Sequence, residues 1–278
     1  MNPEVLTCLR CPICAQDLTT AGNAVRCPTG HSFDLARQGY LNLLAGRGRT
    51  DTADTAAMVA ARAEFLLGGH YAPLAARLAE LATEAQPADA LVLDAGASVG
   101  YYLGAVLDRL PGSNGLALDL SALALRRAAR ANPRIGAVVW DIWRPWPVRD
   151  GCASLVLNVF APRNGAEFRR VLRADGTLLV VTPGPEHLAE LGSRLGMIAV
   201  DPDKDRRLAA SLSEHVELAG RETLTVPLTL SANATEQLVK MGPSAHHLPA
   251  DQGRATFDAI DEPLTATGAF VLSVYRPR

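Results

Sequence analysis

Short apolar runs alternate with helical segments through the middle of the chain. The runs have the length of buried strands, and the segments between them repeat apolar residues at helical spacing. Strands are expected at Leu91–Leu93, Leu116–Asp119, Ala137–Trp140, Ala153–Phe160 and Thr177–Val181, and helices at about 100–110, 121–131 and 167–172. This alternation predicts an α/β fold, a doubly wound parallel sheet with helices on both faces.

Two further helices are expected before this region and a β-rich segment after it. Thr55–Leu67 and Tyr71–Ala85 carry apolar residues at helical spacing, and a Gly-Gly pair separates them. Toward the C-terminus, Val226–Leu230 and Gly268–Tyr275 are expected to be strands, with a helix at Ala234–Met241. These elements extend the α/β pattern at both ends.

Three successive predicted strands end on an aspartate: Asp94, Asp119 and Asp141. Ligands of doubly wound sheets bind at the carboxyl ends of the strands, so the three carboxylates are expected at one site. Asp119 can accept hydrogen bonds from ribose hydroxyls, and Asp141 from an adenine amino group. Asp94 suits a ligand that carries a cation, such as the amino acid end of S-adenosylmethionine.

The turn after the first of these strands contains two glycines, Gly96 and Gly100, within Asp94-Ala-Gly-Ala-Ser-Val-Gly100. Neither glycine has a Cβ, so the backbone can pass close to a ligand. The dinucleotide fingerprint Gly-x-Gly-x-x-Gly would place a glycine where Asp94 stands, at the point where a pyrophosphate approaches. The turn therefore favours a cationic cofactor over a dinucleotide.

Four of the first 31 residues have the types and spacing of a tetrahedral zinc site. Cys11 and Cys14 form one close pair, and Cys27 and His31 form the second. Thiolates and an imidazole suit Zn²⁺, and four protein ligands leave no open position, so the zinc is expected to be structural. Cys8 has the same spacing to Cys11 as Cys11 has to Cys14 and is the alternative ligand.

The composition is that of an ordinary globular protein, with 48% hydrophobic residues, 20% charged residues and a net charge of −2. The first 49 residues carry five arginines against three acidic residues. The Arg47–Arg49 stretch is expected to be either an RNA-phosphate contact or a solvated linker. No apolar run reaches the ~18 residues of a membrane span, and no leader precedes the cysteines, so we expect a cytoplasmic protein without a membrane partner.

Motifs along nearly the whole chain resemble the RlmA family, the 23S rRNA guanine-N1 methyltransferases. They comprise the cysteine module, Phe33–Leu44, Gly69–Leu74, the Asp94 turn and Thr182–Leu188. Asn158–Pro162 and Met241–Ala245 are closer to the Gram-positive branch, which includes a tylosin-resistance enzyme. The resemblance implies a Rossmann-like class I methyltransferase, dimeric and dependent on S-adenosylmethionine. It also implies methylation of N1 of one guanine in hairpin 35 of 23S rRNA, with macrolide resistance as the consequence.

The resemblance further implies that Tyr71, the turn Ser98-Val99-Gly100 and His187 contact the cofactor. The family turn usually reads Asp-x-Gly-Cys-Gly-Glu-Gly, whereas this chain has Ala-Ser-Val in place of Cys-Gly-Glu. Because the middle glycine is lost, either Ser98 keeps a negative φ or the turn differs. We predict three parts of the chain: a zinc-binding RNA-recognition domain (1–46), a linker and helical connector (47–86) and a methyltransferase domain (87–278).

Methylation at guanine N1 requires that a proton leave that nitrogen, so a base or relay is needed. Asp141, His246 and His247 are the candidates, and Asn158 is expected to orient the base; Asn158, Asp141 and His246 are the predicted catalytic residues. The target guanine is expected to be splayed out and stacked on Trp143, Trp146 or Phe160. Of these aromatic residues, Phe160 is the one favoured for the core.

Two other functions fit parts of the sequence. The first is a small-molecule methyltransferase whose zinc module only stabilises it. The second is a non-catalytic RNA-binding protein with a decayed methyltransferase domain, suggested by the altered turn at Ala97–Val99. The zinc module is expected to grip the RNA hairpin by its shape and phosphates in the favoured interpretation.

Overall fold

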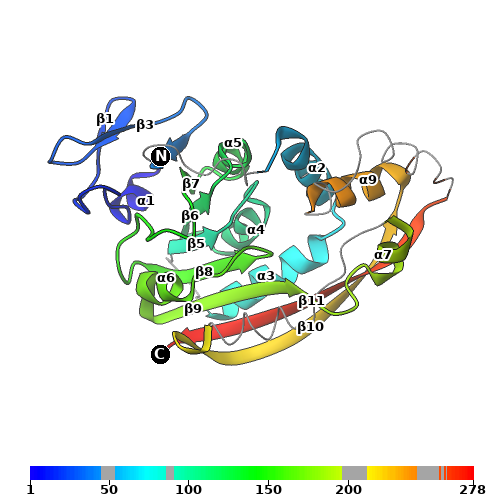
Figure 1. Ribbon diagram of the computed structural model, residues 1–278. Helices are drawn as coiled ribbons and strands as arrows, with labels where there is room; N and C mark the ends of the chain where they lie inside the picture. Colours follow the sequence, from blue (N-terminus) through cyan, green and yellow to red (C-terminus); the bar gives the residue numbers. More distant parts are fainter. Residues whose placement is uncertain (45–53, 86–90, 196–211, 243–256, 258–259, 261) are drawn as a thin grey trace.

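The protein is built around an eight-stranded sheet with the order β10-β11-β9-β8-β5-β6-β7-β4 (Figure 1). The computed structural model describes residues 1–44, 54–85, 91–195, 212–242, 257, 260 and 262–278. The strands of this sheet span Tyr40–Asn42 (β4), Leu91–Ala95 (β5), Asn114–Asp119 (β6), Ile135–Val139 (β7), Ala153–Val159 (β8), Leu172–Pro183 (β9), Val216–Leu230 (β10) and Leu264–Pro277 (β11).

The chain reverses its direction of winding between β5 and β8. From β5 it proceeds through β6 to β7 on one side, and it then returns to β8 and β9 on the other side. Strands β4 to β9 pair in parallel, whereas β11 is antiparallel to both β9 and β10. The predicted doubly wound fold is confirmed, and its switch point places the expected ligand crevice above β5 and β8.

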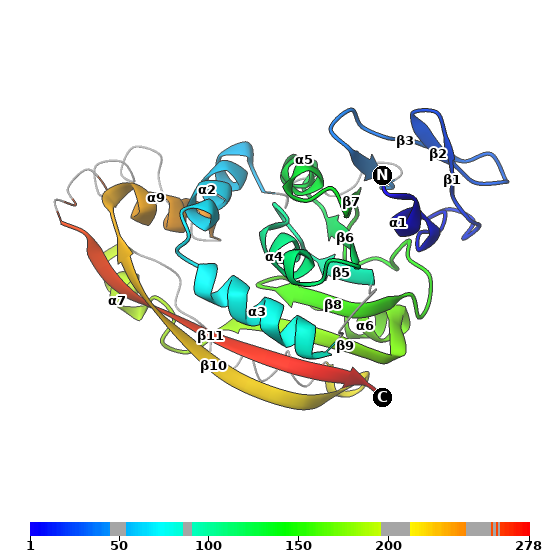
Figure 2. The same ribbon diagram turned by 180° about the vertical axis from the view of Figure 1, so that it is seen from behind.

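Helices cover both faces of the sheet (Figures 1 and 2). Alternate residues of a strand point to opposite faces, so Val92 joins one core cluster and Leu93 the other. The first cluster includes buried residues of α2 (Ala56–Leu67), α3 (Ala72–Ala85), α4 (Tyr101–Arg109), α5 (Ala122–Ala131), α7 (Ala189–Leu195) and α9 (Ala232–Met241). The second includes those of α1 (Pro3–Thr7) and α6 (Gly165–Val171).

Hydroxyl side chains begin two helices close to where the sequence predicts them. Thr55 accepts a hydrogen bond from the backbone N–H of Met58 at 3.3 Å, and Ser121 accepts one from Ala124 at 3.2 Å. Each bond satisfies a backbone donor that the first turn of a helix leaves unpaired. The N-terminal ends of α2 and α5 are therefore specified locally.

The N-terminal module, residues 9–39, forms a small three-stranded antiparallel sheet of its own. Its strands are Thr19–Ala21 (β1), Ala24–Arg26 (β2) and Ser32–Asp34 (β3). The chain then enters the large sheet, because β4 pairs with β7 and Leu41, fully buried, lies opposite Val138. The first 46 residues thus also supply an edge strand of the central sheet, which the sequence did not predict.

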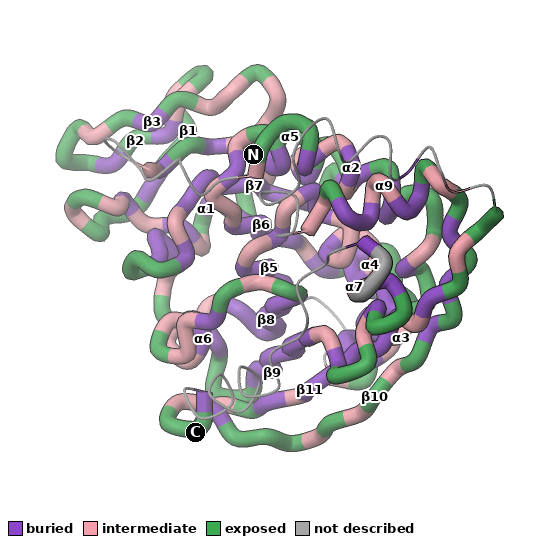
Figure 3. Tube along the Cα trace, turned by 45° about the vertical axis from the view of Figure 1, so that its right-hand side comes forward, coloured by how far each residue is buried: buried purple, intermediate pink, exposed green. Residues whose placement is uncertain are grey.

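The antiparallel strands β10 and β11 are much longer than the apolar segments from which the sequence predicts them. Only Val226–Leu230 is predicted as a strand, whereas β10 begins at Val216. Its first ten residues are mostly exposed, and half of them are Glu, Arg or Thr, because β10 lies at the edge of the sheet (Figure 3). Apolar alternation is weak there, so the sequence carries little strand signal. Among the described residues, no helix is both long and apolar enough to cross a membrane.

Candidate functional site

A cavity of about 500 Å³ opens above the switch point of the sheet. Asp94, Asp119 and Asp141 line it, each at or just beyond the carboxyl end of β5, β6 or β7. We call this space the cofactor cavity. Gly96, Ser98, Val99 and Tyr71 also line it. The structure therefore brings together most of the residues that the sequence predicts to contact a cofactor.

Asp94 is the most deeply placed of the three acids. Its side chain is 2% exposed, and its Oδ1 atom has no hydrogen-bond partner. Burial, and to a lesser degree the charge of Asp119, raises the pKa of Asp94 to about 8. The hydroxyl of Tyr102, on the cavity wall, is also buried without a partner. These unpaired atoms fit a ligand that brings a cation and hydrogen-bonding groups of its own.

The carboxylate of Asp119 organises the turn after β5. Its Oδ2 accepts a hydrogen bond from the backbone N–H of Ser98 at 2.9 Å, and its Oδ1 accepts one from Ser121 at 2.8 Å. Burial raises the pKa of Asp119, and these two bonds oppose that increase. Each oxygen keeps a second lone pair, which suits two ribose hydroxyls.

Asp141 keeps one oxygen without a hydrogen bond. The Oδ1 atom accepts a hydrogen bond from the backbone N–H of Trp143 at 3.0 Å. The Oδ2 atom lies 3.7 Å from the Nε atom of Arg144, an ion pair at the edge of the cavity. This carboxylate can therefore receive a donor from a ligand.

The altered turn is accommodated by a serine with left-handed backbone geometry. Ser98 has φ 48°. The first alternative for this position, a negative φ at Ser98, is therefore wrong, and the second, a turn that differs from that of the family, stays a prediction. A left-handed backbone costs a non-glycine residue about 1–2 kcal/mol, so neighbouring contacts have to hold it.

The contact that holds Ser98 comes from Arg62 of α2, which sequence reasoning missed. One guanidinium nitrogen donates to Ser98 Oγ at 2.7 Å and also to the carboxylate of Asp54. The other donates to the backbone carbonyl of Met241, at the end of α9, at 2.7 Å. Arg62 is the one cation in the described lining of the cofactor cavity, and it ties two helices to the turn.

The glycines of the turn serve the protein's own packing. Gly96 and Gly100 have φ 88° and 76°. A Cβ on Gly96 would lie 2.4 Å from the Cβ of Ala161, and one on Gly100 would lie 2.9 Å from Ala128 of α5. Gly100 is absent from the described lining of the cofactor cavity, so its predicted cofactor contact stays a prediction.

Tyr71 and His187 meet in an aromatic cluster beside the cavity. Tyr71 is 2% exposed, and its hydroxyl lies 3.4 Å from His187 Nε2. The ring of Phe270 is 5.0 Å from each of them, measured between centroids. Burial lowers the pKa of His187 to about 4, so the ring is neutral at physiological pH. His187 packs behind Tyr71 and is not part of the described cavity lining.

The three aromatic candidates for base stacking separate into surface and core. Trp143 is 65% exposed and Phe160 is 43% exposed, and both line the cofactor cavity. Trp146 is buried, donates from Nε1 to the carbonyl of Ile142 at 2.9 Å and packs on Phe168. The expectation that Phe160 is the core residue is therefore wrong: its backbone turns outward at the end of β8, and Trp146 fills the core.

Asn158 lies below the cavity. It is fully buried, and its Nδ2 atom donates to the carbonyls of Ala95 at 3.1 Å and Pro162 at 2.9 Å. These bonds hold the β5 turn against the loop that carries Phe160. His246 and His247, the other predicted residues for proton transfer, lie outside the described residues.

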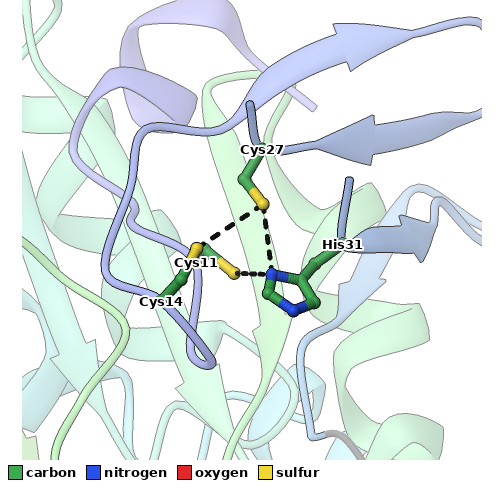
Figure 4. Close-up of side chains that lie close together, drawn as sticks. All are labelled: Cys11, Cys14, Cys27 and His31. Carbon is green, nitrogen blue, oxygen red and sulfur yellow. Dashed lines mark hydrogen bonds between the residues drawn. The ribbon is translucent and has the colours of Figure 1, made fainter. Parts of the chain in front are cut away.

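The four predicted metal ligands converge in the N-terminal module (Figure 4). All their ligand atoms lie within 4.8 Å of one another. His31 Nδ1 is 3.6 Å from Cys11 Sγ and 3.3 Å from Cys27 Sγ, and Cys14 Sγ is 3.6 Å from Cys27 Sγ. A tetrahedral zinc with Zn–S bonds of ~2.3 Å places its sulfurs about 3.8 Å apart, so the cluster fits this ion.

Cys8 lies apart from this cluster. Its Sγ atom donates to the carbonyl of Glu4 at 3.6 Å and is hydrogen-bonded with Cys152, which lowers the pKa of Cys8 to about 7. The structure thus brings together Cys11, Cys14, Cys27 and His31, the set that the sequence favours, and leaves Cys8 outside it. Because four protein ligands leave no open position, the zinc is structural.

The fold and the two sites define a class I methyltransferase that uses S-adenosylmethionine and carries an N-terminal zinc ribbon. The model of the family described as RlmA, N-terminal, matches residues 9–47. A protein of Micromonospora griseorubida named as a 23S rRNA (guanine-N1)-methyltransferase is 52% identical over the full length of both chains. The 23S rRNA (guanine(748)-N1)-methyltransferase of Streptomyces fradiae is 49% identical, with 91% of this chain and 90% of that protein covered.

This chain belongs to the family of 23S rRNA (guanine-N1)-methyltransferases. A more distant relative, YxjB of Bacillus subtilis, is 31% identical over 87% of this chain and 88% of its own length. Among solved structures, the YcgJ protein from Bacillus subtilis covers 72% of this chain and 97% of its own, with a TM-score of 0.50 and 14% identity. The Haloferax volcanii methyltransferase in complex with its Trm112 activator has a TM-score of 0.50 at 17% identity, covering 84% and 99%. These two structures support the fold alone.

Proposed function

We propose that this chain transfers a methyl group from S-adenosylmethionine to N1 of a guanine in hairpin 35 of 23S rRNA. The observation that carries the proposal is the cofactor cavity itself. Asp94, Asp119 and Asp141 meet in one cavity, and the exposed ring of Trp143 stands on the same wall. A cofactor pocket with an open aromatic rim fits a reaction on a base delivered from outside. The choice of 23S rRNA as substrate and of guanine N1 as the methylated atom follows the names of the relatives.

The acids define how the cofactor is held in this proposal. Asp94 pairs with its cationic amino acid end, Asp119 accepts from the ribose hydroxyls, and Asp141 accepts from the adenine amino group. Ser98, Val99 and Gly100 supply the turn, and Tyr71 closes the wall with His187 behind it. The sulfonium group of the bound cofactor supplies both the methyl carbon and its leaving group.

The residues of this chain then have to align the guanine and accept the N1 proton. We assign stacking of the splayed base to Trp143 and Phe160, whose rings are exposed on the cavity wall. Asn158 acts through the backbone, because its Nδ2 atom donates to Ala95 at the end of β5 and to Pro162 in the loop that carries Phe160. One oxygen of Asp141 lacks a hydrogen bond, so this carboxylate binds adenine or accepts the proton. If adenine occupies it, His246 or His247 is the proposed proton acceptor.

We assign hairpin recognition to the N-terminal module, whose fold the zinc maintains. We also propose that the enzyme acts as a homodimer in the cytoplasm and confers resistance to macrolides such as tylosin. The division at residues 46 and 86 is kept as a functional division, although β4 physically joins the first part to the central sheet.

The test is methylation of naked 23S rRNA by the purified protein with labelled S-adenosylmethionine. We expect one N1-methylguanosine in hairpin 35, located by mass mapping of nuclease fragments. A small-molecule methyltransferase would instead label metabolites of a cell extract and leave the rRNA unlabelled. A non-catalytic protein would bind no cofactor in calorimetry. Either result would overturn the proposal.

A further inference from the structure

A second hollow lies beside the cofactor cavity, between α2, α4 and α5. Its volume is about 810 Å³, and it shares Leu66, Val99 and Tyr101 with the lining of the cofactor cavity. The α2 wall is apolar and ends at Leu67, which is 78% exposed. We call this hollow the arginine groove, because α5 lines it with Arg126, Arg127 and Arg130.

The three arginines of the groove are exposed to solvent. Arg126, Arg127 and Arg130 make no hydrogen bond or ion pair within the part of the chain that the structure describes. Arg134, just beyond the same helix, is used differently. Its guanidinium donates to the carbonyls of Leu107, Leu110, Pro111 and Ser113 and closes the end of α4. Arg134 thus stabilises the protein's own structure, whereas the guanidinium groups of the three groove arginines can bind a ligand.

In the N-terminal module, Arg10 pairs with Asp150 at 2.5 Å, whereas Arg26 and Arg37 are exposed and pair with no described acid. None of these three arginines is in the described lining of the cofactor cavity. The turn that follows β3 packs on α5, because a Cβ on Gly39 would lie 3.6 Å from Ala129. The arginine face of α5 therefore continues directly from the module toward the cofactor cavity.

The cofactor cavity offers no free positive charge to a polyanionic substrate. Four carboxyl groups, those of Asp54, Asp94, Asp119 and Asp141, stand in its described lining, and its single cation, Arg62, is paired with Asp54. Phosphates of a nucleic acid therefore need cationic partners outside this cavity. The arginine groove contains only one described carboxylate, Asp108, which accepts a hydrogen bond from Asn132. Three guanidinium groups against one carboxylate make the described lining of the groove net positive.

We propose that the arginine groove binds backbone phosphates of the substrate RNA, between the module that recognises the hairpin and the cavity that receives the guanine. The inference rests on the proposed function, since it assigns a location to the same RNA. Guanidinium groups pair with phosphate in bidentate geometry, and these contacts fix register and orientation without reading sequence. The exposed Leu123 and Leu67 at the groove can contact ribose faces.

The test is a salt titration of rRNA binding by the full-length triple variant R126Q/R127Q/R130Q. Glutamine keeps helix propensity, so α5 is expected to fold. We expect the slope of log affinity against log salt to become shallower by about 2 to 3, and affinity at low salt to fall at least roughly 10-fold. The variant with lysine at all three positions is expected to recover most of the slope. Cofactor affinity, measured by calorimetry, is expected to stay unchanged.

The matched control removes the same charge elsewhere. R169Q/R173Q/R221Q changes α6, β9 and β10, which lie on the other face of the sheet or at its far edge. A wild-type slope in the groove variant, or an equal loss in both triples, would overturn the inference. So would a change in sedimentation of the groove variant alone, because it would identify a contact between copies of the chain. Absence of rRNA binding by the wild type would instead overturn the proposed function.

Discussion

The cofactor cavity and the zinc site hold their groups by different physical means. The acids of the cavity stand at the ends of β5, β6 and β7, whose residues are almost completely buried in the large core. The zinc ligands stand on a module of three short strands, whose buried apolar side chains besides the cysteines are Leu9, Leu18, Val25 and Phe33, packed in the same cluster as one face of the large sheet. The first site is positioned by packing, and the second largely by the metal itself.

This difference makes a separation of functions testable. A site positioned by a large core is expected to persist without its ligand. Burial of the apolar residues already offsets the conformational entropy that the chain loses on folding. A module with so few buried side chains cannot meet that cost without its metal. Cofactor binding and RNA recognition should therefore fail independently.

The largest effect is expected when the zinc site is broken. Replacing Cys14 and Cys27 by serine removes two ligands, and metal binding in such modules contributes roughly 10 kcal/mol or more to folding. We expect rRNA affinity to fall at least about 100-fold, because the hairpin-binding surface unfolds. Cofactor affinity, measured by calorimetry, should stay within about twofold of wild type.

Cys8→Ser is the matched control, since Cys8 lies outside the metal cluster. Deleting residues 1–45 would separate the two regions less cleanly than the double serine variant. It would also remove β4 and α1, including Leu41 and Val5, which are both fully buried in the second core cluster, against one face of the large sheet. Loss of cofactor binding in the double serine variant would show that the two regions are not separable.

The next largest effect concerns Asp94 and pH. The pKa of this carboxyl is raised to about 8 in the folded protein, so its ionisation at neutral pH costs stability. The contribution of protonated Asp94 to folding stability is fully present below the pKa of about 4 that this carboxyl has in the unfolded chain. It is lost as the pH rises toward 8. A cationic ligand favours the ionised form, so cofactor binding near pH 6.5 should release up to about one proton per site. Calorimetry in buffers of different ionisation enthalpy measures this release.

Asp94→Asn should abolish that proton release. It should also weaken cofactor binding by roughly 30-fold, equivalent to about 2 kcal/mol, because a buried charge pair is lost. The variant is expected to be more stable than the wild type above pH 8 in the absence of cofactor. Asp34→Asn, at an exposed position of β3, is the control. Equal proton release by Asp94→Asn and wild type would place the cofactor's cation elsewhere.

A smaller effect is expected at the rim of the cavity. Trp143→Ala removes the exposed ring proposed to stack on the guanine, and such contacts contribute about 1–3 kcal/mol per base. We expect kcat/KM for rRNA to fall roughly 10-fold while cofactor affinity is unchanged. Trp143→Phe should restore most of the activity. A normal kcat/KM in the alanine variant would leave Phe160 as the stacking residue.

The sequence predicted the parts of both sites that are encoded locally. Asp94, Asp119 and Cys11 could be predicted as site residues because their residue type and their position along the chain are enough to identify them. Arg62 and β4 could not be found in this way, because each depends on a contact between distant segments. Arg62 meets Ser98 and Met241 only in the folded chain, and Tyr40–Asn42 is too short to be recognised as a strand without β7 beside it.

The smallest predicted effect tests how the turn beside Asp119 is kept in place. Ser98→Gly relieves the left-handed backbone but loses the hydrogen bond from Arg62, and both terms are about 1 kcal/mol, so stability should change little. Ser98→Ala keeps the strain and loses the same bond, so it should be less stable than wild type by about 1 kcal/mol in urea unfolding. In an Arg62→Met background the bond is already absent, so Ser98→Ala should cost almost nothing further. If Ser98→Ala costs as much in both backgrounds, then Arg62 does not hold the turn, and the cofactor cavity is positioned by the sheet alone.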